Sequence, residues 1–519
     1  MYSTIFSGAV QGVSAYLVSV EVDISSGLPA FFMVGSLSTE VRESRERVTV
    51  ALKNAGLNLP PCRITVNLSP ADRKKEGTAF DLPIAVGILE STGMIPRGVS
   101  EGILFLGELG LDGELKKARG VLPVVQAAAA GGIKQCIVPA FNAAEAAVVP
   151  GVTVWKAENI LDIMHFLTTE GKDREAILSR GFVDTDSLFA GEENEENSMS
   201  YPDFSEVTGQ EAARRAAEIA AAGFHHLLMV GPPGAGKSMI AKRIPGILPP
   251  LTLEESLEVT SIVSVAGLME EGEALVTKRP FRSPHHTVSQ SALIGGSIVP
   301  RPGMISLAHR GVLFLDELPE FQRMVLDALR QPLEDRRVNI SRSSGNVTYP
   351  CDFMLVCAMN PCPCGYYPDV NRCHCTRIQV GKYMGKISGP ILDRIDLCVE
   401  LQPVEYASLK RNHIGESSAD IRRRVEKARR CQQERFEGTA YRFNGEIEAS
   451  VIEKYCGLGT EQQQCMERLY DSLHLSARAY HRILRVARTI ADLEGAEEIG
   501  TEHLMEASFY RPSLEYWGY

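Results

Sequence analysis

The sequence lacks any long apolar stretch and any excess of positive charge. No run approaches the roughly 20 apolar residues that span a bilayer, and the first residues, MYSTIFSGAVQGVS, have no basic segment ahead of an apolar core. The formal net charge is −11 over 519 residues, of which 44% are hydrophobic and 23% charged. We therefore expect a soluble cytoplasmic protein with no membrane partner. Any nucleic-acid surface must be a local basic stripe, because the whole chain is acidic.

Residues 231–238, GPPGAGKS, match the phosphate-binding loop pattern G-x-x-x-x-G-K-[ST] and follow the apolar run Leu227–Val230. In this pattern the glycines let backbone N–H groups point at phosphate oxygens. The lysine reaches the β- and γ-phosphates, and the hydroxyl binds Mg²⁺. The alternative is a glycine-rich turn without a ligand. The predicted nucleotide-binding residues are Gly231, Pro232, Pro233, Gly234, Ala235, Gly236, Lys237 and Ser238.

A second apolar run, Val312–Leu315, ends in two acidic residues downstream of the phosphate loop. We predict that Asp316 binds Mg²⁺ and that Glu317 orients and deprotonates the attacking water. The alternative is a buried strand that merely ends in acids. The next apolar run, Phe353–Met359, ends at Asn360, whose amide could also position the water.

Four of the twelve cysteines crowd into one stretch, as the two C-x-C pairs Cys362/Cys364 and Cys373/Cys375. On an extended backbone, residues i and i+2 face the same way, so each pair can present two thiolates to one ion. The pattern predicts a structural zinc site. Reduced free thiols, disulfides and an iron–sulfur cluster are the alternatives. The other cysteines are scattered and are interpreted as core residues, because disulfides are not expected in a reducing compartment.

The pattern along the chain indicates several domains. Residues 1–168 mix short β-rich runs with helical segments, which predicts an α+β domain. Residues 169–203, which include EENEEN, are acidic and are predicted to be a linker. Residues 204–404 are predicted to form an α/β core, and residues 405–519 have a helical pattern interrupted by glycines. The fold class is therefore multidomain α/β and α+β.

A first candidate for DNA contact is the insert at residues 278–310, which is rich in Arg, His, Pro and Gly. Its turn-forming glycines and prolines favour a hairpin, and we predict that Arg279 and Arg282 contact DNA. The alternative for each arginine is a surface ion pair. The adjacent His285 and His286 could ligate a metal, but a structural role is the favoured interpretation.

A second candidate is residues 335–350, in which apolar and polar positions alternate on both sides of SSGN. This pattern predicts a β-hairpin with Arg342 near its tip. Basic hairpin tips in a ring would contact a nucleic-acid backbone without reading its sequence. We predict DNA contact by Arg342, with an ion pair to Glu334 or Asp335 as the alternative.

The segments KKEGTAFDLPIAVGILESTG and GELGLDGELKKARGVLPVVQAAAAGGIKQCIVP resemble the C-terminal proteolytic domain of the Lon protease family. That domain works with a Ser–Lys dyad, but the serine position falls on Ala79 and the lysine position near Val121. Without a hydroxyl nucleophile and an amine base, its covalent chemistry cannot run. We therefore expect a Lon-like domain without peptidase activity. A nearby basic cluster is either a binding surface or a solvated edge: Lys116, Lys117 and Arg119.

Further segments carry a resemblance that covers essentially the whole chain: PAFFMVGSLSTEVRESRERV, NLSPADRKKEG, FRSPHHT, NPCPCG, SGPILDRIDL and ARTIADLEG. They resemble the magnesium-chelatase-like ATPases of the ComM/YifB family. The resemblance implies an AAA+ core with inserted hairpins and a helical lid of the magnesium-chelatase C-terminal type. It also implies a homo-hexameric helicase that drives branch migration when incoming single-stranded DNA is recombined during natural transformation.

The same resemblance implies roles for three polar residues. Asn360 occupies the sensor 1 position, and Arg478 matches sensor 2 of the lid. Arg394 corresponds to an arginine that contacts the γ-phosphate held by a neighbouring subunit, a task that suits a guanidinium. The alternative for Arg394 is an ion pair within the chain, to Asp393 or Asp396.

The preferred prediction is an ATP-hydrolysing ring motor on DNA that uses ATP, Mg²⁺ and structural zinc, with recombination proteins as further candidate partners. The alternative is a magnesium-chelatase-type ATPase that remodels a partner protein. The Lon-like domain argues against this alternative, because chelatase ATPase subunits lack it. A Lon-type ATP-dependent protease is a third candidate, opposed by Ala79 and Val121.

Overall fold

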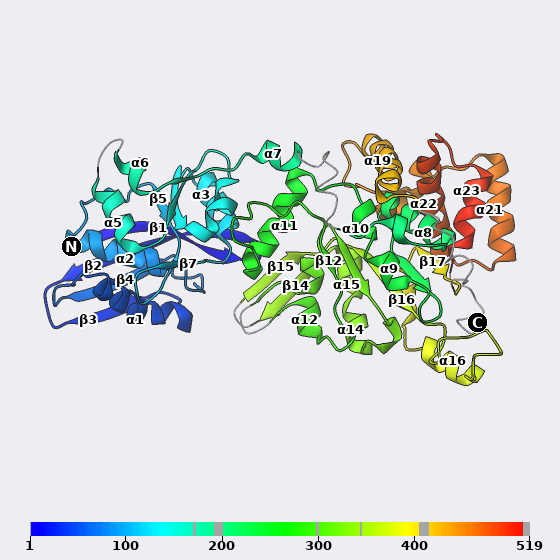
Figure 1. Cartoon of the computed structure of the whole chain (residues 1–519), viewed down its shortest axis with the longest axis horizontal. Coiled ribbons are helices and arrows are strands. Elements are labelled where there is room, and N and C mark those ends of the chain that lie inside the picture. Colours follow the sequence, from blue (N-terminus) through cyan, green and yellow to red (C-terminus); the bar gives the residue numbers. More distant parts are fainter. Residues whose placement is uncertain are drawn as a thin grey trace.

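The computed structural model describes residues 2–169, 173–190, 201–296, 300–342, 345–403 and 415–511. A sheet-based domain, a central α/β core and a C-terminal group of helices follow one another along the long axis of the molecule (Figure 1). Within the described ranges, no helix is both long enough and apolar enough to cross a membrane.

The first domain is built on an eight-stranded sheet. Its strands are β1 (Tyr2–Gln11), β2 (Ser14–Ser25), β3 (Ala30–Val34), β4 (Arg63–Ser69), β5 (Ile103–Phe105), β8 (Gln135–Pro139), β9 (Thr153–Ala157) and β10 (Arg180–Gly181). Their order in the sheet is β10-β9-β8-β5-β1-β2-β4-β3. A small separate pair consists of β6 (Glu108–Leu109) and β7 (Leu115–Lys116). The long antiparallel hairpin β1–β2 forms the middle of the sheet, and parallel strands extend it on the β5 side.

Helices pack on this sheet through their apolar faces. They are α1 (Thr39–Asn54), α2 (Asp81–Thr92), α3 (Val121–Ala130), α4 (Ala143–Ala147) and α5 (Ile160–Thr168). All but the last residue of α2 are buried, as expected of a helix that is apolar on every side. Its first residue, Asp81, is fully buried and accepts two hydrogen bonds from the Arg47 guanidinium, at 2.7 and 2.9 Å. The buried carboxylate is therefore paired, as burial of a charge requires.

The predicted linker at residues 169–203 is wrong in its first half. Strand β10 pairs with β9 at the edge of the sheet, and Leu178 is buried in the core of the first domain. The short helix α6 (Arg174–Ile177) packs on α5, and α7 (Thr185–Ala190) follows. The segment is acidic overall, but apolar residues such as Leu178 pack on the first domain beside the edge of its sheet. Residues 191–200, which include EENEEN, lie outside the described residues.

The central core contains a five-stranded sheet that is parallel throughout. Its strands are β11 (Leu227–Val230), β12 (Phe281–Arg282), β13 (Val312–Leu315), β16 (Met354–Met359) and β17 (Leu397–Glu400), in the order β12-β13-β16-β11-β17. Every residue of β11, β13 and β16 is buried, as expected of strands covered on both faces. The predicted phosphate-loop strand and the predicted acidic strand therefore lie on either side of β16.

The helices of the core are mostly short. They are α8 (Glu211–Gly223), α9 (Lys237–Ala241), α10 (Ile244–Ile247), α11 (Leu253–Ala266), α12 (Gln290–Ile294), α13 (Met304–Leu307), α14 (Arg323–Ala328), α15 (Arg330–Asp335), α16 (Arg377–Met384) and α17 (Gly389–Leu392). Helix α11 also holds the first domain, because Ser264 at its C-terminal end donates a 2.6 Å hydrogen bond to Glu145 and accepts a 3.0 Å bond from the backbone N–H of Gly120.

The two predicted hairpins have different outcomes. β14 (Arg337–Arg342) and β15 (Gly345–Pro350) form the antiparallel hairpin predicted for residues 335–350. In the described part of residues 278–310, hairpin pairing is limited to one bridge between Gly295 and Pro302. The segment instead contains β12, α12 and α13. The Ser289 side chain caps α12 by accepting a hydrogen bond from the N–H of Ala292 at 3.2 Å.

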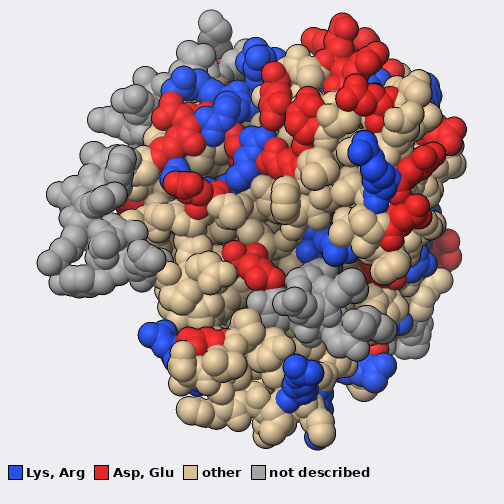
Figure 2. All heavy atoms as spheres, turned by 90° about the vertical axis from the view of Figure 1, so that its right-hand side faces the viewer, with Lys and Arg blue, Asp and Glu red and all other residues tan. Residues whose placement is uncertain are grey.

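The C-terminal part is helical, as predicted. Its helices are α19 (Ser418–Arg435), α20 (Ile452–Tyr455), α21 (Thr460–Ser472), α22 (Ala477–Glu494) and α23 (Thr501–Phe509). α19 and α22 pack on α8, which joins this part to the core. On the face of the molecule at this end, basic side chains are scattered among acidic ones (Figure 2). Several arginines of α19 bond within the chain, including Arg424 to Glu218 and Arg435 to Asp492. These pairs favour a structural role for those arginines.

Candidate active site and metal centre

The phosphate loop connects the C-terminal end of β11 to the first turn of α9. Gly234 and Gly236 have φ values of +79° and +91°, in the left-handed region that glycine adopts without a steric penalty. The loop thereby curls into the start of α9, whose first residue is Lys237. The sequence predicted this strand–loop–helix unit.

The Lys237 ammonium lies folded against its own loop. Its Nζ donates to the carbonyl oxygens of Gly231 and Pro232, at 2.6 and 2.9 Å, and to Oδ1 of Asn360 at 3.1 Å. Burial lowers the pKa of Lys237, and the negative charges of Asp316 and Glu317 oppose that shift. The contact also brings together two residues that the sequence predicted separately, Lys237 on α9 and Asn360 after β16.

The predicted Mg²⁺ ligands meet at the same sheet edge. The Ser238 hydroxyl donates to Oδ2 of Asp316 at 2.6 Å, and Oδ1 of Asp316 accepts from the backbone N–H of Glu317 at 2.9 Å. The carboxyl ends of parallel strands form a crevice at which ligands bind. A hydroxyl and a carboxylate at this point are oxygen ligands of the kind that Mg²⁺ takes. The residues present therefore fit a Mg²⁺–nucleotide complex.

Glu317 projects from an unusual backbone position. Its φ is +53°, which is uncommon for a residue other than glycine. Its Oε2 lies 3.4 Å from Nδ1 of His286, and the His286 ring lies 4.0 Å from that of His285 between ring centroids. His286 thus contacts the predicted general base, and His285 stacks on His286. The sequence indicated a structural role for these histidines but not this partner.

Gln210 is a site residue that the sequence analysis missed. Its Nε2 donates to the carbonyl oxygen of Ala235 in the phosphate loop, at 3.1 Å, and to that of Gln402, at 2.6 Å. It therefore ties the loop to the segment that follows β17. Both of its partners are backbone carbonyls assembled by the fold, so the sequence contains no signal for these contacts.

Neither candidate arginine touches the phosphate loop of its own chain in the contacts of the described residues. Arg394 pairs with Glu334 and donates to the carbonyl oxygen of Pro390. Arg478 pairs with Asp393 at 2.5 Å. The alternative of an ion pair within the chain is therefore present, but with Glu334 as the partner in place of Asp393 or Asp396. Asp393 pairs with Arg478, and Asp396 lies 3.3 Å from Arg485. Arg478 thus pairs with the residue that directly precedes Arg394, so the two arginines lie near each other.

The predicted DNA-contacting arginines lie in different environments. Arg279 is 6% exposed, and its guanidinium donates to the carbonyls of Pro249, Pro250 and Arg310 and to Glu255. Its prediction as a DNA contact is wrong, because the guanidinium is buried and donates its hydrogen bonds within the protein. Arg282 is partly buried on β12 and donates to the carbonyl of Leu307 at 3.3 Å. Arg342 pairs with Gly345 through its backbone, but its side chain lies outside the described residues.

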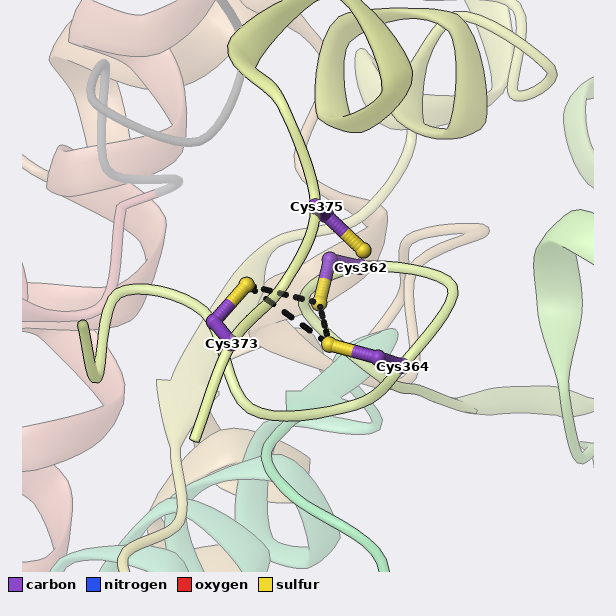
Figure 3. A group of neighbouring side chains, drawn as sticks. All are labelled: Cys362, Cys364, Cys373 and Cys375. Carbon is purple, nitrogen blue, oxygen red and sulfur yellow. Dashed lines mark hydrogen bonds between the residues drawn. The ribbon is translucent and has the colours of Figure 1, made fainter. Parts of the chain in front are cut away.

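The four crowded cysteines converge, as predicted (Figure 3). The Sγ atoms of Cys362 and Cys364 are 3.3 Å apart, and Cys373 Sγ lies 3.8 and 3.6 Å from them. All four sulfur atoms, including that of Cys375, lie within 4.8 Å of one another. Tetrahedral zinc with Zn–S bonds of about 2.3 Å places its sulfurs about 3.8 Å apart. The spacing is compatible with a Cys₄ zinc site.

The chemistry of these thiols fits a cation as well. A hydrogen bond from the backbone N–H of Tyr366 lowers the pKa of Cys364. Burial, together with hydrogen bonds to Cys364 and Cys362, raises the pKa of Cys373. Thiols this close cannot all become thiolates without a compensating positive charge, because each thiolate opposes ionisation of the next. A divalent cation supplies that charge.

Comparisons with known proteins agree with this geometry. Family models match residues 203–409, described as "Magnesium chelatase, subunit ChlI", residues 20–142, "Subunit ChlI of Mg-chelatase", and residues 415–511, "Magnesium chelatase, subunit ChlI C-terminal". The competence protein ComM of Haemophilus influenzae is 42% identical over 508 residues, which cover 98% of this chain and 97% of that protein. YifB of Escherichia coli, described as uncharacterized, is 41% identical over 510 residues, 98% of this chain and 97% of YifB.

The chain belongs to the ComM/YifB family. Membership of the ComM/YifB family, together with the chelatase-type core, identifies a magnesium-chelatase-like AAA+ protein and implies ATPase activity. The magnesium-chelatase 38 kDa subunit of Rhodobacter capsulatus is similar over less of the chain. It is 23% identical over 330 residues, which cover 58% of this chain and 84% of that subunit. Residues 20–142 match a model that itself names a chelatase subunit, so the first domain alone does not separate ComM/YifB proteins from chelatase subunits.

Proposed function

We propose that this protein is an ATP-driven ring motor that acts on DNA and promotes branch migration during recombination of incoming DNA. The observation that carries the proposal is the assembly of Lys237, Ser238, Asp316, Glu317 and Asn360 at one sheet edge. This nucleotide site occurs in a chain similar over its whole length to a competence protein. A role in competence would favour a use of the ATP energy on DNA.

In the proposed reaction, the phosphate loop binds the β- and γ-phosphates of ATP. Lys237 leaves the carbonyl oxygens that it now contacts and donates to the phosphate oxygens instead. Ser238 and Asp316 would hold Mg²⁺, which would supply positive charge to the phosphate oxygens. Glu317 accepts a proton from the attacking water, and Asn360 orients that water. All of these groups follow the carboxyl ends of the neighbouring strands β11, β13 and β16, either in the next loop or in the first turn of α9, which supports a shared role.

The proposed assembly is a homo-hexamer in which each site is completed by the next subunit. Arg394 and Arg478 support this arrangement, because among the described residues both bond to groups other than their own phosphate loop. Their ion pairs with Glu334 and Asp393 are exposed on one side and cost little to exchange for phosphate contacts. Arg394 is the residue proposed to contact the neighbour's γ-phosphate.

DNA contact is proposed for the hairpin β14–β15 through Arg342, and for Arg282 near the end of β12. The first domain, which extends past residue 168, is proposed to be a Lon-like scaffold without peptidase activity. Ala79 and Val121, the positions of the Lon dyad, pack in one apolar cluster. Two apolar side chains in that position support loss of the protease chemistry.

The decisive experiment measures ATP hydrolysis and strand displacement with no DNA, with single-stranded DNA and with forked DNA. We expect DNA to raise the ATPase rate and forked substrates to be unwound. The three chelatase-type family matches favour a second candidate, an ATPase that remodels a partner protein. An ATPase that neither responds to DNA nor displaces a strand would support this second candidate and overturn the DNA motor.

Arg394→Ala is expected to leave ATP affinity near wild type and to lower the steady-state ATPase rate by at least about 100-fold, since an arginine supplied to a phosphoryl-transfer site contributes about 10³–10⁵. ATPase assays at subunit concentrations that favour assembly measure the rate. Arg323→Ala is the matched control, because Arg323 is 79% exposed on α14.

A mixing experiment tests whether Arg394 acts between subunits. Arg394→Ala and Lys237→Ala are each expected to be inactive alone. In a mixed ring, some interfaces combine an intact phosphate loop from one variant with an intact Arg394 from the other, so part of the activity should return. If mixing restores nothing while both variants assemble, the role of Arg394 in a neighbour's site is refuted.

A further inference from the structure

The loop that carries the cysteine cluster contacts the phosphate loop both before Cys362 and after Cys364. Asn360, two residues before Cys362, accepts the hydrogen bond from Lys237 at 3.1 Å. The backbone N–H of Gly231 donates to the carbonyl of Met359 at 3.2 Å. The first contact region therefore lies immediately before the first cysteine.

The second contact lies immediately after Cys364. Gly365 packs on Pro233 so closely that a Cβ atom at position 365 would lie 2.5 Å from Pro233 Cδ. Gly365 also has a φ of +87°, which favours glycine. The pair Cys362/Cys364 is thus enclosed between two contacts with the phosphate loop, one through Asn360 and one through Gly365.

Cys362 holds the turn that carries Gly365, through its backbone carbonyl and its sulfur. The N–H of Gly365 donates to the carbonyl of Cys362 at 3.0 Å, and the N–H of Tyr367 points at the Cys362 sulfur at 3.4 Å. Cys362 is completely buried. Farther along the loop, Val370 is 88% exposed, and the residues around it are exposed too. The loop has few apolar anchors, so a bound metal would supply much of the free energy that orders it.

We propose that a metal ion held by Cys362, Cys364, Cys373 and Cys375 positions the phosphate loop through Gly365 and Asn360, so that nucleotide affinity depends on metal occupancy. The inference rests on the proposed nucleotide and zinc sites. The cluster acts through Pro233 and Lys237 and does not touch the nucleotide, so its cysteines and Gly365 are positioning residues.

Zinc removal is the first test. Affinity for a fluorescent ATP analogue is measured in excess Mg²⁺ on full-length protein as purified under reducing conditions, after a zinc-selective chelator, and after zinc is restored. Zinc content is measured on the same samples. We expect one zinc per chain, a loss of affinity of about tenfold or more on removal, and recovery on restoration. Unchanged affinity after complete removal of zinc would overturn the proposal.

Gly365→Ala separates positioning from metal binding. Its added methyl group meets Pro233, whereas all four thiols remain, so we expect normal zinc content, a near-normal melting temperature and weakened ATP-analogue binding. Gly381→Ala is the matched control, because a Cβ at position 381 meets nothing within 4 Å. Wild-type affinity in Gly365→Ala would overturn the proposed contact.

The outcomes also separate this proposal from the proposed function. A zinc content near zero in reduced, purified protein overturns the metal site, whatever the ATPase does. Zinc-loaded wild-type protein that binds no ATP analogue overturns the nucleotide site. Neither result depends on DNA, so failure of the DNA motor leaves the test intact. Cys431→Ser, which alters a cysteine on α19 outside the cluster, is expected to leave both readouts unchanged.

Discussion

Lys237→Ala is expected to lower ATP affinity by at least about 100-fold and to abolish measurable ATP hydrolysis. Lys237 is 8% exposed, and its ammonium is held by two loop carbonyls and by Asn360. Burial has already removed most of its water, so contacts with phosphate oxygens replace carbonyl contacts with little further loss of hydration. Removing one preorganised group that faces a charged transition state costs about 10²–10³ in rate. Equilibrium binding of a fluorescent ATP analogue and steady-state ATPase assays measure both effects.

The control for this variant is Lys242→Ala. Lys242 is exposed just beyond the end of α9, so its removal changes the net charge equally without touching the loop. We expect Lys242→Ala to bind and hydrolyse ATP like the wild type. Circular dichroism should show that both variants remain folded. Retention of ATP affinity in Lys237→Ala would refute the assignment of residues 231–238 as the phosphate site.

Glu317→Gln is expected to bind ATP with near wild-type affinity and to hydrolyse it at least about 100-fold more slowly, because a positioned general base contributes about 10²–10⁴ to rate. The amide keeps the size of the side chain but cannot accept the proton of the attacking water. Glu317 lies beside Asp316, which the substitution leaves in place. Single-turnover hydrolysis measured alongside analogue binding separates the chemical step from affinity.

Glu320→Gln is the matched control for Glu317→Gln. Glu320 lies in the same turn, but its carboxylate pairs with Lys386 at 3.1 Å on the surface. We expect its ATPase rate to match the wild type. A Glu317→Gln variant that turns over ATP at the wild-type rate would remove Glu317 from the role of general base, and Asp316 would then need testing in its place.

Local pattern was enough to predict the groups of the nucleotide site. Residues 231–238 fix their own backbone through glycines, and Asp316 and Asn360 each follow a buried apolar strand. Parallel strands that end at one edge bring such residues together without further information. The convergence of Cys362 with Cys364, and of Cys373 with Cys375, follows similarly from i, i+2 spacing on an extended backbone.

The sequence could not predict which distant residues the arginine side chains would bond to. The basic, glycine- and proline-rich neighbourhood of Arg279 favours a DNA-contacting surface, yet Arg279 is buried against the backbone carbonyls of Pro249, Pro250 and Arg310. For Arg394, the alternative to a contact with a neighbouring subunit is an ion pair with Asp393 or Asp396, but its partner within the chain is Glu334 on α15. These outcomes depend on which elements pack together, and an arginine carries no pattern that names its acceptor.

The sequence by itself determined the phosphate loop, the acidic strand end, the cysteine cluster, the hairpin at residues 335–350 and the helical C-terminal part, because each depends on neighbours within a few residues. Only the tertiary structure decided that Gly365 lies on Pro233, that His286 contacts Glu317 and that β10 belongs to the first domain. Those contacts join residues far apart in the chain, and only packing of the whole core determines which of many compatible surfaces meet.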